Sequence, residues 1–278
     1  MTLIRGSLNI GRSFRDEPLR PSQAWRARMR KDAVRGLERL LGHVELPDAT
    51  LAELGREFAA ELDDDLLLLA ARGTLAQADR VAEMARRGEM PASQFRSACE
   101  GADAPSPVKS VRDWVIDRIG IDTAGYHADA LANARLVLDA ARRPWPEHWQ
   151  AIQALDPPTH WQRTRLGRST LLGVQTFALD VARLRCAMVA IAVERHRLAH
   201  GDWPASLTTL GPLAGDPFTG GPLHYRRTAE GVEVFVASPP FDDQGDGWID
   251  PAVGGLPLNQ GIGFCLYDVP HRNQVGGR

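Results

Sequence analysis

Four aspartates gather in a short proline- and glycine-rich segment near the C-terminal end of the sequence. Residues 237–250 read ASPPFDDQGDGWID, and the carboxylates belong to Asp242, Asp243, Asp246 and Asp250. Calcium binds about six to eight hard oxygen ligands, which carboxylates, backbone carbonyls and water supply. A turn held by glycine can aim several such oxygens inward, where they would repel one another without a cation. The segment therefore predicts either a calcium site or a solvated polar turn.

The spacing of these residues does not fit an EF-hand. An EF-hand loop beginning at Asp242 would correctly place Gly247 at its sixth position. Its twelfth position would be Val253, where the motif requires a bidentate glutamate. A calcium site in this segment must therefore be of another kind.

Two histidines lie one helical turn apart in the sequence ERHRLAHG, at His196 and His200. This spacing can chelate a metal, but a zincin motif would need glutamate at the position of Arg197. Polar and cationic residues in the last turn of a helix also interact favourably with its dipole. We prefer this second interpretation.

Asp216, before Pro217, is predicted to initiate a turn.

Two charged stretches are expected to be solvated faces of helices. The arginine-rich stretch RSFRDEPLRPSQAWRARMRKDAVRGLERL could contact an acidic partner, but solvation is the simpler interpretation. The run Asp63–Asp65 is expected in the middle of a helix, where consecutive side chains point in different directions. These carboxylates are therefore not expected to form a catalytic pair.

The three cysteines, Cys99, Cys186 and Cys265, are far apart and form no C-x-x-C motif. This excludes a zinc ribbon and a thioredoxin-type pair. Cys186 and Cys265 have apolar sequence neighbours and are predicted to be small core residues. A single disulfide between two of the three stays open.

The composition is that of a soluble globular protein, with 44% hydrophobic and 24% charged residues. A net charge of -2 gives no bulk attraction to nucleic acid. The sequence contains no apolar run long enough for a membrane span or a signal-peptide core. A cytoplasmic location is therefore the default expectation, and the cell envelope is the alternative if translation starts upstream of Met1.

Residues 22 to about 158 show apolar side chains at the three- and four-residue spacings of helices. The expected buried stripe of the first helix consists of Trp25, Met29, Val34, Leu37, Leu40 and Leu41. A second helix is expected from Asp48 or Thr50 to Gly73, and a third is expected to end near Gly88.

A break at ALDPPTHW predicts a boundary between a helical region, residues 1–160, and a second region, residues 161–278. The second region should begin with a long amphipathic helix from about Ser169 to His200, ended by Gly201. Short strands are expected at PLHYRR, VEVFVAS and GIGFCLYDV. The predicted fold class is α+β, a mainly helical region followed by a long helix packed on a small antiparallel sheet.

The motifs after this helix resemble a known module. A helix ending in His-Gly-x-Trp-Pro is followed by SLTTL, a DPFTGGPLHYR hairpin, a second strand and an Asp/Gly loop. This order resembles the C-terminal globular part of the major pseudopilin of type II secretion systems, over about residues 176–250. It is also similar to a group of large bacterial proteins of unassigned activity that carry this module after a helical region, which the closing GFCLYDVPHR fits better.

The resemblance implies a long helix against a small sheet and a last loop that holds calcium. In this sequence the implied ligands are the carboxylates of the four aspartates and the backbone carbonyl of Ser238. The sequence departs from a pseudopilin in lacking an uninterrupted hydrophobic helix, since charged residues such as Asp180 and Arg183 occupy its place. Pro239 and Pro240 also replace a more flexible pair. A filament subunit is therefore not expected.

The resulting functional expectation is a non-enzymatic structural or interaction protein with an unidentified protein partner, linked to envelope or secretion assembly. Its pseudopilin-like module would be stabilised by calcium. The alternative is a hydrolase whose site lies between the helical region and the α+β module, recognisable by converging polar side chains and a perturbed pKa.

Overall fold

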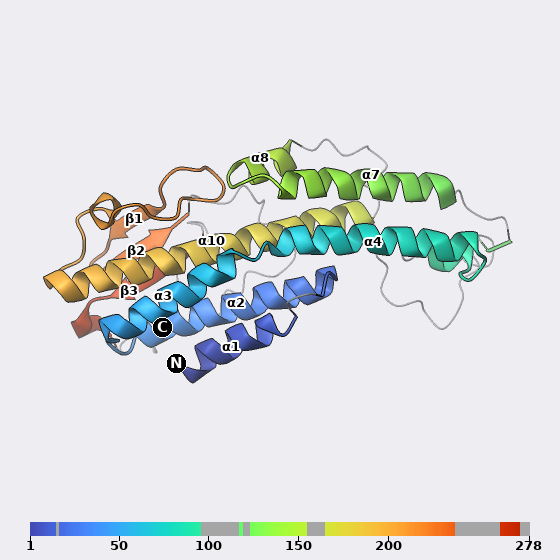
Figure 1. Cartoon of the computed structure of the whole chain (residues 1–278). Coiled ribbons are helices and arrows are strands. Elements are labelled where there is room, and N and C mark those ends of the chain that lie inside the picture. Colours follow the sequence, from blue (N-terminus) through green and yellow to red (C-terminus); the bar gives the residue numbers. More distant parts are fainter. Residues whose placement is uncertain (15–16, 96–116, 119–122, 155–164, 237–261, 273–278) are drawn as a thin grey trace. The chain divides into compact units, whose positions relative to one another are not determined.

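The structure is a computed structural model that describes residues 1–14, 17–95, 117–118, 123–154, 165–236 and 262–272 (Figure 1). The described α-helices are α1 (Thr2–Arg12), α2 (Arg20–Leu41), α3 (Asp48–Leu62), α4 (Leu66–Arg86), α7 (Thr123–Ala141), α8 (Glu147–Gln153) and α10 (Arg165–His200). Two short 3-10 helices, η1 (Leu207–Leu210) and η2 (Val269–His271), follow in the C-terminal part.

Three strands form one antiparallel sheet in the order β1-β2-β3 (Figure 1). They are β1 (His224–Arg227), β2 (Gly231–Phe235) and β3 (Gly263–Tyr267). Val234 lies opposite Tyr225 on one side and Phe264 on the other. The prediction of a mixed fold with helices and a small antiparallel sheet is therefore confirmed at this level.

The chain divides into two compact units, each built from separate stretches of sequence. Unit 1 contains Met1–Arg15, Trp25–Asp65 and Phe177–Arg278, whereas unit 2 contains Asp16–Ala24 and Leu66–Thr176. The boundary expected between residues 160 and 161 lies outside the described residues and stays a prediction.

The core of unit 1 uses most of the predicted stripe of α2. Val34, Leu37 and Leu41 are buried, and Leu40 is partly buried. Trp25 was expected in this stripe but is 53% exposed. The buried face of α2 instead includes arginines, because an arginine can be buried where a carboxylate pairs with it.

The long helix α10 ends where the sequence predicted. Gly201 follows it with a φ of +79°, a left-handed conformation that favours glycine at a helix end. In unit 1, the α10 residues Phe177, Leu184 and Ile191 are buried, as expected for an amphipathic helix. The sheet adds buried side chains that include Val232, Val234, Phe264 and Leu266.

The region around Asp63–Asp65 differs from the prediction. The expected single helix is two helices, since α3 ends at Leu62 and α4 begins at Leu66. Gly73 does not end a helix but lies buried within α4. An added Cβ there would lie 1.6 Å from the carbonyl oxygen of Pro18, so the glycine permits a close backbone approach.

Helix α1 was not expected from the sequence. Its buried residues Ile4, Leu8 and Gly11 recur at three- and four-residue spacing, which is the pattern of a short amphipathic helix. None of the described helices is long and apolar enough to cross a membrane.

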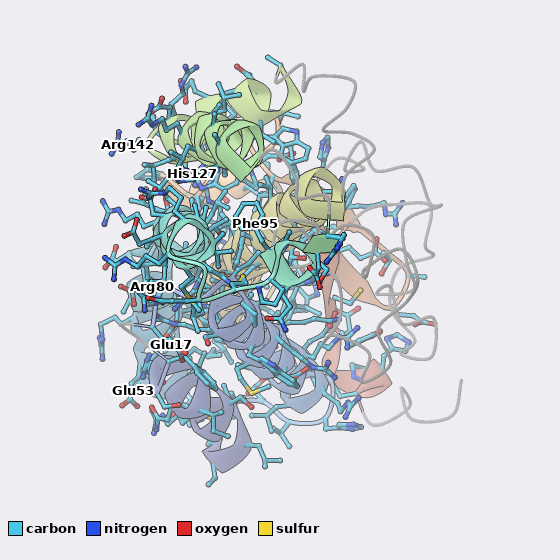
Figure 2. The ribbon with its side chains drawn as sticks, turned by 90° about the vertical axis from the view of Figure 1, so that its right-hand side faces the viewer. Glu17, Glu53, Arg80, Phe95, His127 and Arg142 are labelled. Atoms are coloured by element: carbon cyan, nitrogen blue, oxygen red, sulfur yellow. The ribbon has the colours of Figure 1, made fainter. Side chains whose placement is uncertain are left out.

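Unit 2 is helical wherever it has regular structure in the described residues, and α4 packs against α7. Phe95 is 1% exposed and lies inward, whereas Arg80 and Arg142 point outward (Figure 2). His127 Nε2 lies 2.8 Å from Asp79 Oδ1 and so links α7 to α4. His148 is buried, and burial lowers its pKa to about 4.

Candidate functional site

The predicted calcium ligands Ser238, Asp242, Asp243, Asp246 and Asp250 all lie outside the described residues. A calcium site there stays a prediction. Within the part of the chain that the structure describes, no group of three or more His, Cys, Asp or Glu side chains could hold a metal ion.

The described residues on either side of 237–261, Val236 and Ile262, lie next to each other. The Val236 N–H donates a hydrogen bond of 2.9 Å to the carbonyl oxygen of Ile262, directly beyond the pairing of β2 with β3. The Cys186 thiol lies 3.9 Å from the same Ile262 oxygen, which brings α10 close to this point. Val236 and Ile262 therefore lie at the same end of the sheet.

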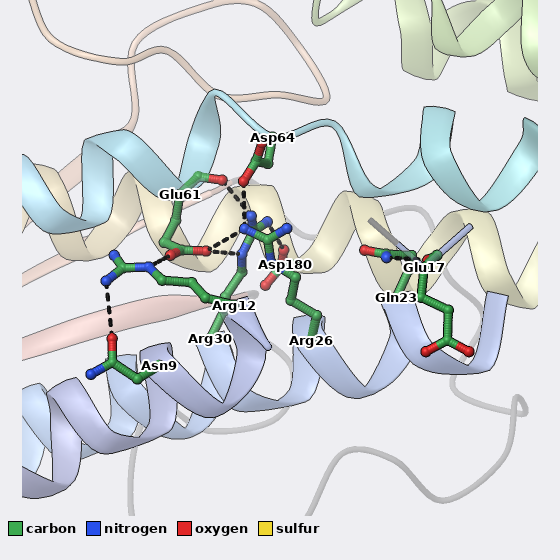
Figure 3. A network of polar contacts seen from close by, with 9 residues as sticks. All are labelled: Asn9, Arg12, Glu17, Gln23, Arg26, Arg30, Glu61, Asp64 and Asp180. Carbon is green, nitrogen blue, oxygen red and sulfur yellow. Dashed lines mark hydrogen bonds and ion pairs between the residues drawn. The ribbon is translucent and has the colours of Figure 1, made fainter. Parts of the chain in front are cut away.

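Glu61, a buried carboxylate in unit 1, lies at the centre of an ion network (Figure 3). Arg30 Nε donates to Glu61 Oε2 at 2.8 Å, and Arg26 Nη2 donates to the same oxygen at 3.2 Å. Arg12 Nε donates to the other oxygen at 2.6 Å. The Arg26, Arg30 and Glu61 side chains are only 1%, 2% and 2% exposed. The network thus joins α1, α2 and α3.

Two further carboxylates complete this network. Arg30 Nη1 donates to Asp180 Oδ2 at 3.0 Å, which links α2 to α10. Arg26 Nη2 donates to Asp64 Oδ2 at 2.5 Å. The guanidinium groups of three arginines thus face three carboxylates: Arg12, Arg26 and Arg30 face Glu61, Asp64 and Asp180. Their formal charges balance.

Electrostatics fixes Glu61 as an ionised structural group. Burial alone would raise its pKa, but Arg30 and the other arginines outweigh this effect and hold it below its usual value. Burial raises the pKa of Asp180, and Arg30 opposes that change. Asp180 Oδ1 has no hydrogen-bond partner among the described residues.

The sequence carries a signal for this network in the spacing of its arginines. Arg26 and Arg30 precede Ala33, Leu37 and Leu41 at the same three- and four-residue spacings, so they extend the buried face of α2. The arginine-rich stretch was expected to be solvated, and for these two arginines that expectation is wrong. Their aliphatic stems pack like apolar side chains, while Glu61 and Asp180 compensate their charges.

A second buried network surrounds Glu194, whose side chain is fully buried. Glu194 Oε1 accepts hydrogen bonds from Arg272 Nη2 at 2.7 Å and from Arg197 Nη2 at 2.8 Å. Arg272 also donates to the carbonyl oxygens of Tyr267 and Val44. Burial would raise the pKa of Glu194, but Arg197 and Arg272 lower it. This network ties the residues after β3 to α10.

His196 and His200, which were predicted to interact with the dipole at the end of their helix, contact nearby backbone oxygens. His200 Nδ1 lies 2.9 Å from the backbone oxygen of His196, and the two rings stack at 4.1 Å. His196 Nδ1 lies 3.3 Å from the carbonyl oxygen of Asp202. These contacts direct both rings toward the backbone of the helix end.

A third charged group lies where α2 passes α10 in unit 1. We call Lys31, Arg35 and Arg183 the cationic cluster. Lys31 and Arg35 are one turn apart on α2, with Glu38 in the next turn. Arg183 follows Asp180 by one turn on α10. All of these side chains are partly buried.

The pKa values around the cationic cluster are strongly perturbed. Burial raises the pKa of Glu38 to about 7, although the Cys265 N–H, which donates to Glu38 Oε1 at 2.8 Å, opposes the change. Burial, Arg183 and Arg35 lower the pKa of Lys31 to about 8. Burial also lowers the pKa of Arg183 to about 10, and Arg35 adds to this effect. The cations are therefore desolvated and close to one another.

The two cysteines within the described residues, Cys186 and Cys265, form no disulfide and are buried, which confirms the prediction that they are core residues. Burial raises the pKa of the Cys186 thiol well above its usual value. A thiol held neutral in this way is unsuited to act as a nucleophile or metal ligand.

The turn predicted at Asp216 is present. Asp216 Oδ1 accepts a hydrogen bond of 2.8 Å from the Phe218 N–H, and the Gly220 N–H donates to the Asp216 carbonyl. Gly220 has a φ of +78°, as a tight turn requires.

No family model, curated protein or solved structure matches this chain.

Proposed function

We propose that this chain is a non-enzymatic structural or interaction protein. Its C-terminal part would be a pseudopilin-like module stabilised by calcium, and it would bind a protein partner in envelope or secretion assembly. The proposal is supported by the buried carboxylates Glu61 and Glu194, each of which accepts hydrogen bonds from at least two arginines. General acid–base groups are usually tuned to a pKa near the working pH, whereas both of these are lowered. They hold segments together.

The residues that carry the resemblance also hold the module together. Trp203 of the His-Gly-x-Trp-Pro motif is buried, and its indole N–H donates to Asp268 Oδ1 at 2.5 Å. Tyr225 on β1 donates its hydroxyl to the Pro204 carbonyl at 2.9 Å. Arg197 lies 5.3 Å from the centre of the Trp203 ring. These contacts connect the end of α10 to the sheet, as a long helix packed on a small sheet requires.

The calcium component can be tested by thermal unfolding of the full chain in excess calcium and then in chelator. Calcium at about 100 times its dissociation constant should stabilise the native state by about 2.7 kcal/mol. This shift should disappear in an Asp242→Ala/Asp246→Ala variant. A matched variant that loses two exposed aspartates elsewhere, Asp63→Ala/Asp139→Ala, should keep it.

The absence of any shift at millimolar calcium would reject the calcium site. A shift of equal size in both double variants would place the ion elsewhere. The interaction role would then depend only on the resemblance and on the two buried networks.

One observation favours the alternative, a hydrolase. Glu38 on α2 contacts Cys265 on β3, and its pKa of about 7 suits a general acid or base. A hydrolytic activity of the purified chain that a Glu38→Gln variant lacks, while its melting temperature is not lowered, would favour the enzyme. Activity that survives in this variant would exclude Glu38 as the catalytic group.

A further inference from the structure

The cationic cluster is assembled by the packing of α2 against α10. The 3.0 Å bond from Arg30 to Asp180 fixes the two helices against each other. Lys31 directly follows Arg30, Arg35 lies one turn beyond Lys31, and Arg183 lies one turn beyond Asp180. Among the described residues, Lys31, Arg35 and Arg183 have no hydrogen bond or ion pair. Cations in partly buried positions are normally paired, because desolvation is otherwise uncompensated.

The charge around this cluster is not balanced. The charged groups that act on Lys31, Arg183 or Glu38 include Arg28, Arg39, Asp32 and Asp180 besides the cluster itself. Five cations therefore stand against three carboxylates, which leaves two positive charges when Glu38 is ionised and three when it is protonated. Asp32 and Arg28 act on Lys31 more weakly than Arg183 and with opposite signs. Asp180 attracts Arg183 but is already bonded to Arg30.

We propose that Lys31, Arg35 and Arg183 form a binding site for a doubly charged oxyanion of the phosphate or phosphomonoester class. Two guanidinium groups offer planar pairs of N–H donors that match the oxygens of a phosphate group, and a lysine adds a mobile third donor. A phosphomonoester carries close to two negative charges at neutral pH, which matches the excess charge of the cluster. This inference goes beyond the proposed structural role and does not depend on calcium.

The site can be tested by calorimetric titration and thermal unfolding of the full chain with inorganic phosphate and with glycerol 2-phosphate. Sodium chloride at matched ionic strength is the reference, since screening alone also reduces repulsion between cations. The buffer should be freed of calcium with a chelating resin, because a soluble chelator is itself an anion. We expect a saturable rise in melting temperature that chloride does not produce.

Variants distinguish this site from general anion binding. Lys31→Gln and Arg183→Gln should each weaken phosphate binding about tenfold or more, since each removes a charge-assisted hydrogen bond. Arg56→Gln removes an exposed arginine on α3 and should leave the affinity unchanged. Lys31→Gln keeps the test valid if Arg183→Gln fails to fold.

The outcomes decide the proposal. The proposal is supported if both compounds bind, or glycerol 2-phosphate alone binds, and this binding is lost in the cluster variants. Which of the two compounds binds shows how much of the ligand is recognised. Equal shifts in the parent, the cluster variants and Arg56→Gln would overturn it, because the anion would then act without this site. No response to either compound would also overturn it. Since calcium is absent throughout, none of these results bears on the calcium site.

Discussion

Helix α2 buries positive charge in two neighbouring places with opposite results. In the Glu61 network, three arginines meet three carboxylates, and the best-buried members are no more than 2% exposed. In the cationic cluster, Lys31, Arg35 and Arg183 make no hydrogen bond or ion pair with the described residues, and cations outnumber the carboxylates around them. The first arrangement suits a fixed contact between helices. The second is suited to bind an anion from outside.

The comparison shows why burial of a charge does not by itself identify a site. Removing one partner from a balanced buried network leaves the other charges uncompensated and strongly destabilises the fold. Removing one cation from an unbalanced cluster relieves repulsion and should stabilise the protein. The sign of the change in unfolding free energy therefore separates the two regions.

The largest expected effect is that of Glu61→Gln. This substitution leaves Arg26 and Arg30 buried without their shared carboxylate, which typically costs about 3–5 kcal/mol. Chemical denaturation at pH 7 measures the loss in unfolding free energy. A matched Glu53→Gln variant removes a carboxylate that is 50% exposed and pairs with Arg5, so its effect should stay below about 1 kcal/mol. Similar effects of both substitutions would contradict the assignment of Glu61 as the centre of the network.

A smaller effect is expected for Glu38→Gln, and it should depend on pH. The folded-state pKa of Glu38 is about 7, above the ordinary value of 4.5, so the native state holds a proton that the unfolded chain releases. The stability that this proton contributes is present below pH 4.5 and is lost as the pH rises to about 7. The variant should therefore be more stable than the parent above pH 7, by on the order of 2 kcal/mol, and similar to it at low pH.

Parallel pH profiles of unfolding free energy for the parent and the Glu38→Gln variant would refute this expectation. The glutamine oxygen can still accept the hydrogen bond from the Cys265 N–H, so the substitution changes mainly the titration.

The smallest effect is expected for Lys31→Gln in chloride buffer without phosphate. The pKa of Lys31 is lowered from 10.5 to about 8, so protonation costs more in the native than in the unfolded state. The variant should be about 1 kcal/mol more stable at pH 7, and salt should reduce this gain. The parent should gain stability between pH 8 and 10.5, whereas the variant should not. Destabilisation by Lys31→Gln would show that its charge is compensated in the native state.

Parts of the fold were predictable because they are encoded by neighbouring residues. The end of α10 at Gly201, the turn at Asp216 and the three short strands follow from local turn chemistry and alternation. The buried positions of Cys186 and Cys265 also followed from their apolar neighbours, whereas the sequence left open whether they form a disulfide. The interruption after Leu62 was missed, because the aspartates and the following leucines both continue a helical pattern.

The candidate site was much less predictable. Arg26 and Arg30 look like any exposed arginines until Glu61 and Asp180 approach them from sequence positions far away. The acidic segment, which gave the clearest sequence signal, lies outside the described residues, so its calcium site stays a prediction.

The sequence alone determined the end of α10, the three strands and the kinds of charge that each helix carries, because these depend on spacing along the chain. Only the tertiary structure decided which charges are paired. The energy of a charge depends on its desolvation and on partners within a few ångströms, and both are set when α2, α3 and α10 pack together. Two arginines thereby became structural contacts, and Lys31, Arg35 and Arg183 became a candidate anion site.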